Sequence, residues 1–255
     1  MEKKLEFSLV IIAKNEEKNL KRCILSVPLA KEVIVVDSQS TDRTVEIAAS
    51  LGARVLQKEW QGFGAQKKWA ASQASFDWIL SLDADEEASP EFLAELQEKF
   101  SSLDPQAVYA IPRVSFHLGR WIRHGGWFPD FQGRLFNRNS SQWNEDALHE
   151  KVVGARRLEF ASPLRHYVFR DLSHNVVTND RYSSLGAQDL HKRGKRFSVL
   201  KLVFKPWIKF IECYFFKLGF LDGLPGFIIA VGAAYSIFLR WAKLWELERL
   251  KNKTS

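Results

Sequence analysis

Two aspartates, Asp83 and Asp85, stand one residue apart at the end of the apolar run in WILSLDADE. Two carboxylates at this spacing can hold a divalent cation whose other ligands are the oxygens of a diphosphate. Such a cation stabilises the charge that develops on a departing nucleoside diphosphate. The pair therefore indicates transfer of a group from a nucleotide-linked donor.

Polar clusters also follow two earlier apolar runs, with Lys14, Asn15 and Glu16 after the first and residues 37–40 after the second. Apolar runs that alternate with helical patterns predict a parallel sheet covered on both faces. Ligands bind beyond the carboxyl ends of the strands in such sheets. Each cluster alone could be a helix cap or a loop, but three at one edge favour a site. The predicted strands are 7–13, 32–37, 53–57 and 77–86, and the predicted helices are 16–27, 41–52 and 65–74.

Other common site motifs are missing from the sequence. It has no GxxxxGK[ST] phosphate loop and no GxSxG elbow, and GFGAQK (62–67) lacks the third glycine of a dinucleotide fingerprint. His149 and Glu150 have no second histidine at zinc-protease spacing. The two cysteines, Cys23 and Cys213, argue against a disulfide scaffold or zinc finger and fit a reducing compartment. Because the opening residues are charged and the next apolar run is strand-sized, we expect no signal peptide.

Charge is unevenly distributed along the 255 residues, which carry a net +7. Residues 1–150 hold 18 Lys and Arg against 22 Asp and Glu, whereas residues 151–255 hold 19 against 8. The apolar share of 46% is that of a globular protein. A basic, aromatic-rich last part predicts an anionic partner, which could be a membrane surface, a nucleic acid or a phosphorylated lipid.

Three stretches, SLVIIAKNEEKNLKRCILSV, EVIVVDSQSTDRT and WILSLDADE, resemble the family 2 glycosyltransferases, whose nucleotide-sugar-binding domain has the GT-A fold. The segments GGWFPDFQGRLFNR (125–138), LHEKV (148–152) and HYVFRDLSH (166–174) are most similar to the lipopolysaccharide-core β-1,4-glucosyltransferases of the WaaE/LgtF type. The resemblance implies an inverting transfer from a nucleotide-diphosphate sugar to an acceptor hydroxyl, with Mg²⁺ or Mn²⁺ as cofactor.

The resemblance also implies roles for individual residues. Asp83 would lie near the ribose, and Asp85 would bind the metal. Lys67 could reach the base or the diphosphate, or could be an exposed helix charge. The remaining donor-binding positions implied are Ala13, Asn15, Glu16, Asp37, Ser40, Gln66 and Ala84.

Inversion in one displacement needs a carboxylate that takes the proton from the acceptor hydroxyl. NEDALHEKV (144–152) offers Glu145, Asp146 and Glu150. We predict Glu150 as the base, positioned by His149, because the narrower group carries His-Glu here. Asp146 is the alternative, since many relatives carry a Glu-Asp pair nearby, and the segment could also be an exposed polar turn.

Acceptor contacts are predicted in GGWFPDFQGRLF. Asp130, Gln132 and Arg134 alternate with apolar residues, so they would face the cleft while their neighbours face the core. Trp127 could stack on a sugar face or belong to the core.

The last hundred residues predict a helical, membrane-associating region. A basic helix at 180–196 precedes a segment in which Lys201, Lys205 and Lys209 recur every four residues. Lysines opposite an apolar, aromatic side are typical of a helix in the membrane interface, although an ordinary packed helix would look similar. Pro206 should break or kink this helix. Residues 223–239 carry no charge, and we expect them to be buried in a bilayer face or a helical subdomain rather than to span a membrane.

Together these patterns predict an α/β GT-A domain over 1–172 and a helical region over 173–255. The expected function is transfer of a hexose, glucose from UDP-glucose by the resemblance, to a lipid-linked glycan of the lipopolysaccharide inner core. The expected location is the cytoplasmic face of the bacterial inner membrane, bound peripherally to its anionic surface. The alternatives are a polyprenyl-phosphate glycosyltransferase and a non-catalytic membrane- or nucleic-acid-binding module. No nucleic-acid partner is expected, because the basic part has no recognisable binding motif for one.

Overall fold

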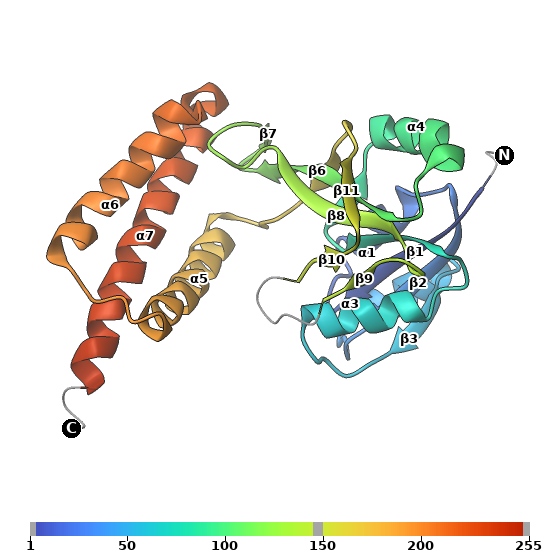
Figure 1. Cartoon of the computed structure of the whole chain (residues 1–255), viewed down its shortest axis with the longest axis horizontal. Helices are drawn as coiled ribbons and strands as arrows, with labels where there is room; N and C mark the ends of the chain where they lie inside the picture. The colour runs from blue at the N-terminus through green and yellow to red at the C-terminus, as the bar shows by residue number, and fades with distance from the viewer. Residues whose placement is uncertain (1–3, 145–149, 252–255) are drawn as a thin grey trace. The chain divides into compact units, whose positions relative to one another are not determined.

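The computed structural model of the chain describes residues 4–144 and 150–251. It divides into two compact units (Figure 1). Unit 1 comprises Met1–Val114 and Asp130–His166, and unit 2 comprises Ser115–Pro129 and Tyr167–Ser255. The division after His166 falls near the predicted domain boundary, whereas no sequence pattern indicated that residues 115–129 group with the C-terminal helices.

Unit 1 is built on a mixed sheet with the strand order β3-β2-β1-β4-β8-β6-β12-β5, in which β11 also pairs with β6. The first four strands are parallel, and β8 runs antiparallel to both β4 and β6. The predicted GT-A sheet is thus confirmed. The strands are β1 (Leu5–Ala13), β2 (Ala30–Asp37), β3 (Arg54–Gln57), β4 (Trp78–Asp83), β5 (Glu86–Ala88), β6 (Ala107–His117), β8 (Asp130–Asn137), β11 (Arg156–Glu159) and β12 (Leu164–His166).

Helices and a small hairpin complete unit 1. The helices are α1 (Leu20–Leu25), α2 (Thr44–Ser50), α3 (Phe63–Ser72) and α4 (Pro90–Lys99), and the last continues into a 3₁₀ turn at Phe100–Ser102. The hairpin pairs β9 (Gln142–Trp143) with β10 (Val152–Val153). Helix α4 has a typical N-terminal cap, because the Ser89 side chain accepts a hydrogen bond from the Phe92 amide and Pro90 occupies the first turn.

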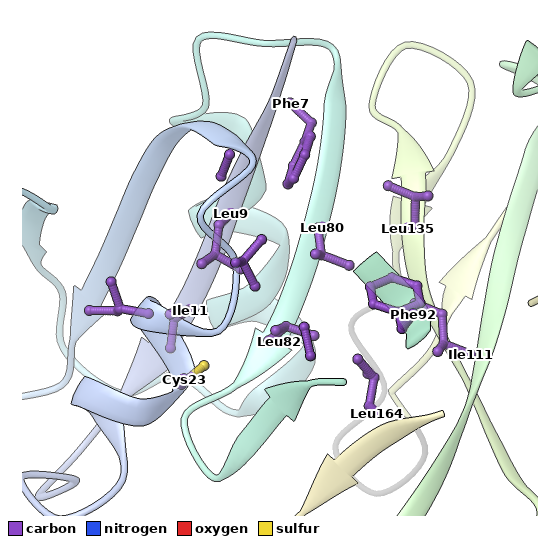
Figure 2. Packing of buried hydrophobic residues seen from close by; sticks show 14 of the residues in the cluster. Phe7, Leu9, Ile11, Cys23, Leu80, Leu82, Phe92, Ile111, Leu135 and Leu164 are labelled. Atoms are coloured by element: carbon purple, nitrogen blue, oxygen red, sulfur yellow. The ribbon is translucent and has the colours of Figure 1, made fainter. Parts of the chain in front are cut away.

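Alternation along β1 places side chains in two separate cores. Phe7, Leu9 and Ile11 enter a cluster that includes Leu80 and Leu82 of β4 (Figure 2). The intervening residues of β1 join a second cluster, on which the alanines of α3 pack. Because successive side chains of a strand point to opposite faces, a continuous apolar run is what a doubly covered sheet requires.

The predicted strand over 77–86 is interrupted at the two aspartates. Strand β4 ends at Asp83, and β5 starts at Glu86 after a turn at Ala84 and Asp85. The Glu86 carboxylate accepts a hydrogen bond from the Asp83 amide at 2.9 Å, which closes this turn. The turn therefore separates the environments of Asp83 and Asp85.

Unit 2 contains α5 (Leu172–Lys192), α6 (Val199–Ile211) and α7 (Gly223–Lys251), and α7 packs along both other helices (Figure 1). Strand β7 (Arg120–Ile122) pairs with the end of β6. A π turn at Glu212–Phe216 and a 3₁₀ turn at Gly219–Asp222 link α6 to α7. Of the predicted break or kink at Pro206, a break does not occur, since α6 continues through this residue while packed against α7.

One stretch of the described residues, Gly219–Leu250, is long and apolar enough to cross a membrane by length and composition alone. It includes the uncharged residues 223–239 and most of α7.

Candidate active site

The polar clusters predicted at the strand ends lie side by side in unit 1. Ala13 at the end of β1 is in register with Asp37 at the end of β2, and Ile12 is in register with Asp83 at the end of β4. Three parallel strands therefore deliver their last residues to one edge of the sheet, the position at which open α/β sheets bind ligands.

The loops after β1 and β2 are tied together by Asn15 and Ser40. The Asn15 amide donates to the Ser40 hydroxyl at 2.8 Å, and the Asn15 side-chain oxygen accepts from the Thr41 amide at 2.8 Å. The Glu16 amide donates to the Thr44 hydroxyl. Asn15 has a φ of 57°, in the left-handed region that asparagine tolerates better than most residues. These residues shape the loop walls of the site.

Two polar side chains, Asp37 and Gln66, are fully buried beneath these loops. One Asp37 oxygen accepts from the Ser40 amide, and the Gln66 amide group donates to the Ser38 hydroxyl and the Lys58 carbonyl. In the described part of the chain, Asp37 Oδ1 and Gln66 Oε1 have no hydrogen-bond partner. Buried oxygens without partners are costly and uncommon, so both are candidates for pairing with a ligand N–H or O–H group.

Lys67 is a buried cation that faces two carboxylates. Its side chain is 3% exposed, and its Nζ lies 2.8 Å from Asp83 Oδ1 and 3.6 Å from Glu150 Oε1. The same ammonium lies over the Trp143 ring, 4.8 Å from its centroid. The alternative that Lys67 is an exposed helix charge is therefore wrong.

Arg134, which the sequence pattern predicted to face the cleft, is also buried. Its guanidinium pairs with the carboxylates of Asp83 and Glu86, and Arg113 pairs with Glu86 at 2.9 Å. Asp130 pairs with Arg113 and accepts a hydrogen bond from Gln132 at 2.7 Å. Thus Asp130, Gln132 and Arg134 share one side of β8, which at Arg134 faces the carboxylates of β4 and β5, whereas the Asp130 side chain is 42% exposed.

These cations fix the charge state of Asp83. Burial by itself would raise the pKa of the Asp83 carboxyl, but the charges of Arg134 and Lys67 outweigh it and hold this pKa well below its usual range. Burial would likewise lower the pKa of Arg134, and Asp83 and Glu86 raise it above its usual value. Asp83 therefore stays ionised and is held by protein groups.

Asp85, beyond the turn, has a different environment. Its carboxylate is 30% exposed, and its Oδ2 lies 3.5 Å from His166 Nε2 at the end of β12. No group of three His, Cys, Asp or Glu side chains that could hold a metal by itself occurs among residues 4–144 and 150–251. A carboxylate with a nearby imidazole nevertheless fits a divalent cation that takes its remaining ligands from phosphate oxygens and water.

The other predicted residues are distributed as follows. Ala84 is buried in the turn between the aspartates. Asp146 and His149 lie outside the described residues, so Glu150 is the candidate base whose position is known. Trp127 belongs to unit 2, where its indole stacks on His117 at 5.7 Å.

Sequence reasoning missed Glu86, Arg113 and His166. Glu86 directly follows the two aspartates, and Arg113 is the single charge in the apolar run of β6, which is itself a signal that a buried partner exists. His166 is the first residue of HYVFRDLSH (166–174), a segment of the family resemblance to which the sequence analysis gave no role. Its proximity to Asp85 depends on β12 pairing antiparallel with β5, a contact between distant segments.

Comparison with known proteins agrees with this geometry. Residues 8–157 match the family described as Glycosyl transferase family 2. An uncharacterized glycosyltransferase of Rickettsia felis is 37% identical over 97% of this chain and 92% of its own length. The lipopolysaccharide core biosynthesis glycosyltransferase LpsC of Rhizobium meliloti is 30% identical over 97% of this chain and 95% of its own.

A solved structure of the Mycobacterium tuberculosis glucosyl-3-phosphoglycerate synthase matches 44% of this chain and 44% of its own, with 28% identity and a TM-score of 0.34. That likeness is too partial to support any assignment. The family match and the relatives that align with nearly the whole chain agree with the carboxylates at the sheet edge. They show that this chain is a glycosyltransferase of family 2.

Proposed function

We propose that the protein is a metal-dependent, inverting hexosyltransferase that moves glucose from UDP-glucose to a hydroxyl of a lipid-linked glycan in the lipopolysaccharide inner core. The observation that carries the chemistry is the position of Lys67, whose ammonium lies within 3.6 Å of both Asp83 and Glu150. It brings a carboxylate of the donor side and a candidate base to one cation. The lipopolysaccharide role is supported by similarity to LpsC along nearly the whole chain.

On the donor side, Asp37 and Asp85 have separate tasks. Asp37 Oδ1, buried and without a partner among the described residues, would accept an N–H from the nucleobase. Asp85 and His166 would hold Mg²⁺ or Mn²⁺, which when bound neutralises charge on the diphosphate leaving group. Asp83, fixed by Lys67 and Arg134, would accept from a ribose hydroxyl.

On the acceptor side, Glu150 would take the hydroxyl proton as the oxygen attacks the anomeric carbon. The bond to the diphosphate breaks as the new glycosidic bond forms, so configuration inverts. Glu150 is 24% exposed, which leaves it open to an acceptor while Lys67 restrains it. The acceptor is fixed in a bilayer, so we place the enzyme at the cytoplasmic face of the inner membrane.

Glu150→Gln tests the base, because it keeps the shape of the side chain but cannot accept a proton. Turnover should fall by about 10² or more, with donor affinity little changed. Asp146→Asn is the matched control, since it removes the alternative carboxylate. An active Glu150→Gln enzyme together with an inactive Asp146→Asn enzyme would transfer the role to Asp146.

Asp85→Ala tests the metal. In this variant, manganese-dependent donor binding and nearly all turnover should disappear. His166→Ala should raise the Mn²⁺ concentration needed for half-maximal activity by roughly ten-fold or more, the usual scale for groups that tune a metal site. Full activity of the wild type in EDTA would refute metal dependence. A thermal-shift screen of nucleotide sugars with Mn²⁺ identifies the donor, because the true donor stabilises the folded enzyme by mass action.

A further inference from the structure

Helix α6 exposes an apolar stripe along its whole length. None of its 13 residues is buried, although most are apolar. The exposed side chains recur three or four positions apart and so share one face of the helix. They are Leu200, Phe204, Trp207, Ile208 and Ile211, with exposed fractions between 43% and 69%.

Helix α7 contributes a second exposed stripe within the same unit. Phe227 of this stripe contacts the ring of Phe210 on α6, with centroids 5.8 Å apart, so the α7 stripe lies beside α6. We call the combined surface the α6–α7 face. The α7 residues of this face are Leu224, Phe227, Val231, Tyr235 and Phe238.

The α6–α7 face is too large to be incidental. Its ten side chains are each 42–70% exposed. A large apolar or aromatic side chain has about 200 Å² of surface, so together they present on the order of 1,000 Å². The largest apolar patch of a typical soluble monomer is only about 300–600 Å², and larger ones mark sites of contact with a partner or a membrane.

Lysines border this face rather than cover it. Lys201 and Lys205 place their ammonium groups 5.2 and 5.1 Å from the centroid of the Trp241 ring on α7, and Lys209 pairs with Glu212 at 3.1 Å. The sequence pattern predicted that these lysines share one stripe opposite an apolar, aromatic side of the helix. Attraction between each cation and the indole ring holds two of them at the α7 side of α6. The outward surface of α6 is therefore apolar.

The charge around the face identifies what covers it. Arg193, Lys195 and Arg196 are exposed just before α6, in a part of the chain where residues 151–255 carry 19 Lys and Arg against 8 Asp and Glu. Pairing with a second copy would bring two basic borders together at a cost in repulsion. An apolar, aromatic surface bordered by Lys and Arg complements an anionic bilayer interface instead.

We propose that the α6–α7 face inserts into the interfacial layer of an anionic bilayer, with Trp207 near its centre and the lysines at headgroup level. Insertion of apolar side chains provides the anchor, and the basic residues add attraction that salt can screen. This proposal supplies the means of attachment for the proposed function but does not depend on catalysis, because binding to lipid can be measured without turnover.

The test is co-sedimentation of the full chain with vesicles of phosphatidylcholine alone and of phosphatidylcholine with 30% phosphatidylglycerol. The probe variant is Phe204→Glu/Trp207→Glu. The matched control is Val177→Glu, which changes a side chain on α5 that is 66% exposed, compared with 67% for Trp207. A third variant, Lys201→Gln/Lys205→Gln/Lys209→Gln, separates charge from insertion.

We expect wild type and Val177→Glu to bind both vesicle types and to keep part of that binding in 0.5 M NaCl. Phe204→Glu/Trp207→Glu should bind both vesicle types at least ten-fold more weakly than wild type. The lysine variant should bind only the anionic vesicles more weakly, by a few-fold. Unchanged binding by the double glutamate variant, or no binding by wild type, overturns the proposal. A wild-type dimer in solution that the glutamates dissociate also overturns it, because a second copy then covers the face. Failure of turnover with intact vesicle binding would refute only the proposed function.

Discussion

Arg134→Met removes the buried cation that Asp83 and Glu86 share. Arg134 is 3% exposed and Glu86 is fully buried, so the variant leaves carboxylate charge in the interior. Removing one partner of a buried ion pair costs about 3–5 kcal/mol of stability. Arg113 still pairs with Glu86 at 2.9 Å, and Lys67 still pairs with Asp83 at 2.8 Å. We therefore expect a loss near the lower end, about 3 kcal/mol.

The measurement is urea unfolding of the full chain followed by circular dichroism, with thermal unfolding beside it. For a chain of this size a loss of 3 kcal/mol lowers Tm by roughly 6–12 °C. The second variant, Glu86→Gln/Arg134→Met, removes a stranded charge as well as the cation. It should be less destabilised than Arg134→Met alone, because the penalty lies in the unpaired carboxylate rather than in a lost attraction.

A matched control separates burial from charge. Arg157→Met removes an arginine that is 57% exposed and lies 3.9 Å from Glu159, so it should change stability by only about 0.5 kcal/mol. If Arg134→Met costs less than about 1 kcal/mol, or if the double variant is the least stable of the set, Arg134 does not hold the carboxylates in the way that this reasoning requires.

Two further predictions concern Lys67 and Glu95. Lys67→Met should lower turnover by about 10², because it frees Glu150, with a smaller loss of donor affinity, because Arg134 still holds Asp83. Lys67→Arg should restore part of the turnover, and a change in donor Kd alone, measured by calorimetry, would assign Lys67 to the donor. Glu95 accepts from two backbone amides and pairs with Lys99 at 2.6 Å, and although burial opposes it, this bonding lowers the pKa of Glu95 to about 2. A lowered carboxyl pKa stabilises the fold fully at pH values above the unfolded pKa near 4.5, and this stabilisation is lost as pH falls through the folded pKa near 2. Allowing for solvent screening, Glu95→Gln should therefore cost about 2 kcal/mol at pH 7 and much less at pH 2 in urea unfolding. An equal cost at both pH values would contradict this.

The parallel half of the sheet could be predicted because its signals are local. Strands β1, β2 and β4 each contain a run of mostly apolar residues, and the polar residues that follow each run in the sequence lie at the end of the same strand in the structure. The turn at Ala84 and Asp85 could not be predicted in this way. It depends on the Glu86 carboxylate and on the pairing of β5 with β12, whose partners Ala88 and Leu164 are far apart in sequence.

Alternation along β8 predicted which residues share a side, but not what covers that side. Asp130, Gln132 and Arg134 share one side of the strand, as the pattern requires. Whether that side meets solvent or protein depends on β4, β5 and β6, which bring Glu86 and Arg113 against it. Likewise, helical spacing grouped the lysines of α6 on one stripe, whereas their direction depends on Trp241 of α7. The spacing of polar and apolar residues predicts which side chains share one face of a strand or helix. Which element packs against that face depends on tertiary contacts.

The charge balance of the site connects its structure to the proposed chemistry. Three carboxylates of the site contact three cations, so the formal charges of this set sum to zero. The carboxylates are those of Asp83, Glu86 and Asp130, and the cations are those of Lys67, Arg113 and Arg134. Asp85 and Glu150 remain in excess of this set. They are also partly exposed, at 30% and 24%, so a ligand can reach both. A formally neutral set of ion pairs supplies rigidity, whereas the two carboxylates outside this set are free to attract a divalent cation and a proton. Those are the two species that inverting transfer requires at opposite ends of the breaking and forming bonds.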